Sequence, residues 1–162
     1  MKTIPLTQGR EAIVDAADYG RLSKVKWFFR AGYAARNRPK GETGPSTIFM
    51  HHEVLPRLPG MRTDHKNGDS LDNRRENLRH CTCHQNQFNM KKPKRNTSGI
   101  KGVTWDKQHG RWMAQISVNR KHIFLGYFDD LGAAGEARRI GAERLHGEFA
   151  CVDHSVALAR VG

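Results

Sequence analysis

The sequence predicts an α+β chain made of two small parts. Residues 111–118, "RWMAQISV", alternate between apolar and polar side chains, as a half-buried strand does. Residues 129–147 repeat small and apolar side chains at helical spacing and end at Gly147, a common helix stop. Residues 63–89 are polar, and their turn formers predict a β-hairpin with a long loop. Short antiparallel strands mixed with a few helices are typical of the α+β class.

The first 58 residues predict a β-rich extension that packs on the part that follows. Segments of β character are separated by Gly, Pro and Asn signals such as "RPKGETGPS". These segments are 12–22, 24–29, 32–36 and 47–55. The candidates for a small core are Val14, Trp27, Phe28, Tyr33, Ile48, Phe49 and Val54. His51 and His52 fall in the last segment and are expected to be strand residues that pack near the site and not ligands, with a phosphate contact by one of them as the alternative.

Residues 59–90 predict a hairpin followed by a short helix. The first strand ends at Asp64 and His65, and residues 66–77, "KNGDSLDNRREN", form the loop. In that loop we interpret Asp72 and Asn73 as turn formers and not as ligands.

The chain returns as a strand over 78–82, and a helix starts after it. Thr82 with Gln85 three residues later fits a capping box, which satisfies the first amides of a helix. Asn86 then lies about one turn into this helix.

The remaining chain predicts a basic linker at 91–98, a second domain at 99–150 and a tail at 151–162. In the second domain, 100–105 would be the first of three strands. The strand 121–128 should pair with 111–118 and point Ile123 and Leu125 inward, His122 and Phe124 outward.

Composition indicates a polyanionic partner and the interior of a cell. The 162 residues carry a formal net charge of +12, which favours nucleic acid first and an acidic membrane surface second. No apolar run has the length of a membrane span, and we see no signal peptide. Three cysteines without a secretory signal argue against a disulfide framework. The expected location is the cytoplasm of a bacterium or of a phage-infected host cell.

The polar stretch also contains the side chains of a hydrolytic site. Asp64 and Asn86 can converge, and their oxygens suit Mg²⁺ or Mn²⁺. Alternation points His65 away from Asp64, where a neutral imidazole could take a proton from water. Asn77 closes the loop and is placed to hydrogen-bond either His65 or the loop backbone.

These residues resemble a known family. "DHKNGDSLDNRRENLRHCTCHQNQFN" is similar to the ββα-metal nucleases of the HNH type, in particular phage and homing endonucleases, with Asn77 twelve residues after His65 and Asn86 nine further on. "FMHHEVL" at 49–55 resembles the segment that usually precedes such a site. The resemblance implies that Asp64 and Asn86 bind the metal, that His65 is the general base, and that Asn77 orients it.

Residues 99–150 resemble an AP2-type DNA-binding domain, which lays a three-stranded sheet backed by one helix in the major groove. From 90 to 122 the chain holds nine Lys/Arg against one acid, which favours phosphate contacts. The expected contacts to double-stranded DNA are Lys91, Lys92, Lys94, Arg95, Lys101, Thr104, Arg111, Gln115, Ser117, His122 and Phe124.

Other interpretations stay open. The chain could be a DNA-binding regulator with an inactive nuclease motif, or an RNA-binding protein. "CTCH" at 81–84 could hold zinc, but its spacing is poor for a tetrahedral site, and buried free thiols at Cys81 and Cys83 are the better prediction. One such site cuts one strand at a time, so a double-strand break needs a homodimer or two visits by a monomer.

Overall fold

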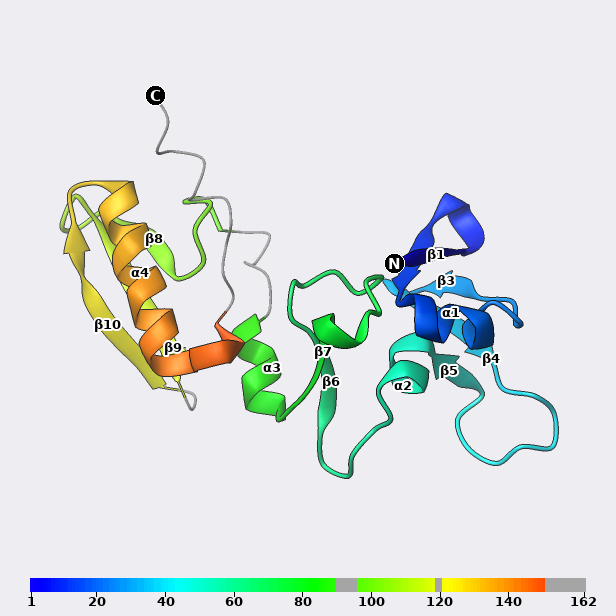
Figure 1. The fold of residues 1–162 in the computed structure, drawn as a ribbon. Helices are drawn as coiled ribbons and strands as arrows, with labels where there is room; N and C mark the ends of the chain where they lie inside the picture. Colours follow the sequence, from blue (N-terminus) through cyan, green and yellow to red (C-terminus); the bar gives the residue numbers. More distant parts are fainter. Residues whose placement is uncertain (90–95, 119–120, 151–162) are drawn as a thin grey trace. The chain divides into compact units, whose positions relative to one another are not determined.

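The computed structural model describes residues 1–89, 96–118 and 121–150 (Figure 1). The chain divides into two compact units, Met1–Cys83 and His84–Gly162. Both contain antiparallel strands and short helices, so the α+β class is confirmed. The division falls inside the segment 59–90, which we predicted as one motif. The predicted tail and most of the predicted linker lie outside the described residues.

The first unit is built from three small sheets and two short helices. Its elements are β1 (Lys2–Pro5), η1 (Thr7–Gly9), β2 (Glu11–Val14), α1 (Ala16–Leu22), β3 (Phe28–Arg30), β4 (Tyr33–Asn37), β5 (Thr47–Phe49), α2 (Met50–Val54), β6 (Arg62–His65), η2 (Arg75–Asn77) and β7 (Leu78–Cys81). β1 pairs with β2, β6 pairs with β7, and β3, β4 and β5 form a sheet in that order. All these pairs are antiparallel.

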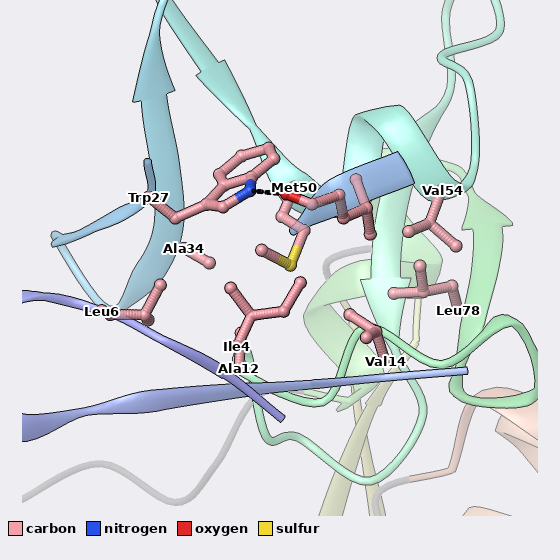
Figure 2. Packing of buried hydrophobic residues seen from close by; sticks show 10 residues of the cluster. Ile4, Leu6, Ala12, Val14, Trp27, Ala34, Met50, Val54 and Leu78 are labelled. Atoms are coloured by element: carbon pink, nitrogen blue, oxygen red, sulfur yellow. Dashed lines mark hydrogen bonds between the residues drawn. The ribbon is translucent and has the colours of Figure 1, made fainter. Parts of the chain in front are cut away.

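One apolar core joins these sheets (Figure 2). Val14, Met50 and Leu78 come from three different parts of the unit and are all buried in it. The indole Nε1 of Trp27 donates a hydrogen bond of 2.8 Å to the main-chain oxygen of Leu22. A buried tryptophan needs such a partner for its N–H, so Trp27 can sit in the core at little cost.

The predicted core is right in part. Val14, Trp27 and Val54 are buried, while Phe28, Ile48 and Phe49 are only partly covered. Tyr33 is 37% exposed, so its assignment to the core was wrong. The core also takes residues from the N-terminal hairpin and from β7, which no single segment could reveal.

The N-terminal hairpin docks on the long loop between β6 and β7. The Ile13 amide donates to Leu71 O, and the Asn73 amide donates to Ile13 O, each at 2.8 Å. Arg75 adds two bonds of 2.8 Å to the carboxylate of Asp18. The start of the chain therefore holds the loop that follows His65.

Two segments predicted as strands turn into helices partway. After β2 the chain forms α1, where the Asp15 carbonyl accepts from Tyr19 N at 3.0 Å. After β5 it forms α2, because the spacing of Met50 and Val54 buries both on one face of a helix turn. His51 and His52 are therefore helical and not strand residues.

The second unit is a three-stranded sheet covered by one long helix. Its elements are α3 (Cys83–Asn89), which begins at the boundary, β8 (Val103–Asp106), β9 (Arg111–Val118), β10 (Lys121–Phe128), α4 (Leu131–His146) and η3 (Gly147–Phe149). The strand order is β10-β9-β8, and both pairs are antiparallel, as predicted. The side chain of Asp130 caps α4 by accepting from Ala133 N at 2.7 Å.

Small residues let α4 approach the sheet closely. A Cβ added at Gly141 would lie 2.9 Å from Leu125 Cδ1, and one added at Gly135 would lie 2.8 Å from Ile100 Cδ1. The pairing of β9 with β10 shifts between Phe124 and Gly126, a β-bulge that lets Leu125 pack inward. Ile123 was predicted to be buried but is 38% exposed. No helix in the described part of the chain is long and apolar enough to cross a membrane.

Candidate functional site

Asp64 lies on β6 with its carboxylate covered. It is 6% exposed and faces Arg79 across the hairpin. Arg79 donates to Asp64 Oδ2 from Nε at 2.9 Å and from Nη2 at 2.8 Å. The hairpin register thus places a guanidinium against the predicted metal ligand, a partner that sequence analysis did not find. Its signal was available, because antiparallel pairing of 62–65 with 78–81 sets Asp64 opposite Arg79.

His65 follows on the same strand and has different neighbours. It is 6% exposed, and its ring lies 5.2 Å from that of His51 at 85° and 6.1 Å from that of Tyr33. Burial lowers the pKa of His65, while the amide of Asn73 and nearby carboxylates act in the opposite direction. The imidazole is therefore neutral at neutral pH, the form that can accept a proton.

Asn77 holds the loop that follows His65. Its Oδ1 accepts from Asn67 N at 3.0 Å, and its Nδ2 donates to Asp72 O at 2.8 Å. Its own carbonyl accepts from Lys66 N at 2.8 Å, directly after His65. The expected hydrogen bonds to the loop backbone are therefore present. The role of orienting His65, which the resemblance implies for Asn77, stays a prediction.

Asp72 and Asn73 are buried loop residues. Asp72 is 2% and Asn73 1% exposed. The carboxylate of Asp72 accepts from Arg74 Nη2 at 2.7 Å and from Asn67 Nδ2 at 2.9 Å, and these bonds lower its pKa. Their interpretation as loop formers stands, but Asn73 also has its amide near His65. Nothing in the local sequence distinguished it from an ordinary turn residue.

His51 and His52 extend His65 into a row of imidazoles. The rings of His51 and His52 lie 4.2 Å apart, and His51 also stacks on Phe49 at 5.6 Å. Burial, His52, His65 and Arg57 lower the pKa of His51 to about 3. His52 is half-buried, and its pKa is also lowered, chiefly by burial. Sequence analysis placed these residues near the site but did not predict ring contact with His65.

Asn86, the second predicted metal ligand, lies in the middle of α3 and is half-buried. From His84 onward this helix belongs to the second unit. There Lys101 Nζ donates to Phe88 O at 3.0 Å, and the Phe88 ring stacks on His146 at 3.8 Å. The convergence of Asn86 with Asp64 stays a prediction.

The predicted DNA face of the second unit is one face of its sheet. Strand pairing sets Thr104 beside Met113, Gln115 beside Phe124, and Ser117 beside His122. These side chains alternate with Ala114 and Ile116, which are buried. Because alternate residues of a strand point to opposite faces, this face lies opposite the one that packs on α4. Arg111 starts the same face.

Lys101 does not belong to this face. It precedes β8, and its ammonium holds main-chain oxygens of α3, so its assignment to the sheet face was wrong. Lys91, Lys92, Lys94 and Arg95 lie outside the described residues.

The face is exposed, with polar and aromatic side chains. Phe124 is 56% exposed, and its ring lies 5.0 Å from that of Tyr127. Ser117 Oγ and His122 Nδ1 lie 3.0 Å apart. Arg111 pairs with Asp129 through Nε at 2.8 Å, but both side chains are largely exposed. Solvent screens such a pair, so a phosphate could replace the carboxylate at small cost.

The cysteines differ from each other in burial. Cys81 is buried, and burial raises the pKa of its thiol to about 11. Cys83 is exposed, so its prediction as a buried thiol was wrong; Arg62 Nε lies 3.2 Å from its sulfur. No group of three or more His, Cys, Asp or Glu among the described residues could hold a metal ion.

Comparison with known proteins identifies a phage relative. Protein 3.8 of Escherichia phage T7 is 36% identical to this chain over 91 residues, which are 56% of the chain and 74% of that protein. No family model matches the chain, and no solved structure matches it. At this identity and coverage, the chain belongs to the family of phage T7 Protein 3.8.

Proposed function

We propose that this protein is a divalent-metal-dependent endonuclease that hydrolyses phosphodiester bonds of double-stranded DNA. The observation that carries the proposal is the hairpin end at Asp64 and His65. There a buried carboxylate and a neutral, buried imidazole lie on consecutive residues of a strongly basic chain. The residue types and spacing resemble the ββα-metal nucleases of the HNH type.

The metal would be Mg²⁺ or Mn²⁺. Asp64 offers a carboxylate, which suits a hard cation, and Asn86 would be the second protein ligand. Such a small protein set fits Mg²⁺, which keeps several waters and takes further oxygens from phosphate. A bound cation would stabilise the charge that develops on the phosphate and on the leaving oxygen.

His65 supplies the proton transfer. Its neutral imidazole takes a proton from a water molecule, whose oxygen attacks the phosphorus. The bond from phosphorus to the 3′ oxygen breaks, and this oxygen takes a proton from solvent, which gives 5′-phosphate and 3′-hydroxyl ends. Asn77 acts on this step through the loop, because it ties Lys66, Asn67 and Asp72 together directly after the base. Burial of His65 in the unit keeps its base form populated at neutral pH.

The second unit would hold the DNA. Its exposed face offers Arg111, Gln115, His122 and Phe124 in neighbouring strand positions. Cationic groups there contribute affinity through phosphates, and polar groups can read base edges. The resemblance to an AP2-type domain supports this division of roles.

Cleavage of supercoiled plasmid tests the proposal. We expect relaxed or linear product with Mg²⁺ or Mn²⁺, none with EDTA, and none with His65→Ala. The control is Lys24→Ala, which removes an exposed charge of the same unit. The ratio of nicked to linear product then distinguishes nicking from double-strand breakage. Metal-dependent cleavage that survives in His65→Ala would contradict the assigned base.

A second candidate is a DNA-binding regulator without nuclease activity. It is favoured by the Asp64–Arg79 pair, since the carboxylate already has a cationic partner. It predicts tight duplex binding in a gel shift and no cleavage of any DNA at any metal concentration. Cleavage that depends on Asp64 would exclude it.

A further inference from the structure

A row of three imidazoles leads from the surface of the first unit to His65. His52 is half-buried in α2, His51 is 7% exposed, and His65 is 6% exposed. The ring separations are 4.2 Å from His52 to His51 and 5.2 Å from His51 to His65. His52 is therefore the solvent-side end of a row whose inner end is the proposed base.

The outer end of this row has an unbalanced cationic environment. Burial, Arg57 and His65 all disfavour the charged form of His52, and no carboxylate opposes them. The carboxylate of α2 itself, on Glu53, is engaged by Arg21 and Arg36. Arg57 is exposed and forms no ion pair among the described residues. The guanidinium of Arg57, a cation without a counter-charge beside the neutral His52 ring, raises the local potential for an anion.

The middle of the row contains a buried polar atom that lacks a partner. Nδ1 of His51 is covered and has no hydrogen-bond partner in the described part of the chain. Buried polar atoms in native proteins nearly always have one, so an orphaned one indicates a site that water or a ligand completes. Tyr33 and Phe49 pack against the same ring and fix its orientation.

We propose that His52 and Arg57 bind the phosphate group of the nucleic acid beside His65. This inference rests on the proposed function for the identity of the substrate, but the anion site itself does not depend on cleavage. A neutral imidazole N–H and a guanidinium can both donate hydrogen bonds to phosphate oxygens, and the negative charge of the phosphate strengthens them. His51 is the spacer between this pair and His65, so the phosphate would be held on the α2 side of the base.

The first experiment uses inorganic phosphate and the full chain. The ring signals of His52 are followed by NMR as phosphate is added, with chloride at equal ionic strength as the reference. We expect a saturable shift of the His52 signals with phosphate and none with chloride. Arg57→Gln should abolish this shift, while Lys24→Ala should leave it intact. Equal shifts with phosphate and chloride would overturn the proposal.

The second experiment uses supercoiled plasmid and Mg²⁺. His52→Ala and Arg57→Ala should each lower kcat/KM by about 10- to 100-fold, the effect of losing one charge-assisted hydrogen bond. Arg57→Lys should recover part of this loss, and thermal unfolding should show that each variant is folded. Folded variants that cleave like the wild-type protein would contradict the assignment. If phosphate shifts His52 but no plasmid is cut, the anion site stands and the nuclease proposal fails.

Discussion

The two candidate sites of this protein are built on opposite principles. At the β6–β7 hairpin the polar groups are buried, and each has its place set by neighbours such as Arg79, His51 or the loop backbone. On the outer face of the β8–β10 sheet the polar groups are exposed, and the ion pair there is screened by water. Buried groups keep a fixed geometry, as a hydrolytic site requires. Exposed groups can exchange one partner for another, as a DNA-binding face requires.

The largest effect is expected when a buried charge loses its partner. Arg79→Met leaves the Asp64 carboxylate buried without its guanidinium, which should destabilise the protein by about 3–5 kcal/mol. Urea unfolding measures this. The matched control is Arg111→Met, which breaks an exposed pair and should change stability little. The double variant Asp64→Asn with Arg79→Met should regain most of the loss. Equal losses at Arg79 and Arg111 would remove the contrast between the two sites.

The next effect concerns the loop that follows the base. Asn77→Ala removes the partners of Asn67 N and Asp72 O, and should cost about 2 kcal/mol. Plasmid cleavage should also fall, because the loop begins directly at His65. Urea unfolding and the initial cleavage rate measure the two effects, with the exposed Asn37→Ala as control. A loss of cleavage without any loss of stability would assign Asn77 a direct role at the base.

A smaller effect is a pH dependence of stability. The pKa of His51 is about 3 in the folded protein, while an unfolded histidine has a pKa of about 6.5. Both states are neutral above pH 6.5, so His51 has no effect there. Below it the unfolded state binds the proton first, and stability falls by up to about 1.4 kcal/mol per pH unit. Urea unfolding from pH 7.5 to 5.5 should show a flatter slope in His51→Phe, and an unchanged slope would contradict the buried, neutral ring.

The smallest effect is expected on the exposed sheet face. Phe124→Ala should weaken duplex DNA binding by about 3- to 10-fold and leave stability nearly unchanged, because the ring is mostly exposed. Ile140→Ala is the control, since Ile140 is an exposed apolar residue on α4, the helix that covers the opposite face. Fluorescence anisotropy at fixed salt measures both. Equal weakening by the two changes would place the DNA elsewhere.

Local patterns were enough for the second unit and for the hairpin. The alternation in 111–118 predicted β9, and the turn formers within the polar loop predicted the hairpin of β6 and β7. The same kind of local pattern did not predict the helices α1 and α2. Short helices that follow closely on a strand look like a longer strand, since α1 has seven residues and α2 has five, at most about two helical turns.

The sequence by itself determined the α+β class, the hairpin that carries Asp64 and His65, and the polar face of the second sheet. These depend on periodicity and turn chemistry within some ten residues. Only the tertiary structure decided that Asn77 holds the loop, that Lys101 caps α3, and that His51 lies against His65. Such contacts join residues far apart in the chain, and their partners depend on packing and strand register. A side chain's type limits which bonds it can form, but its neighbours in the fold select among them.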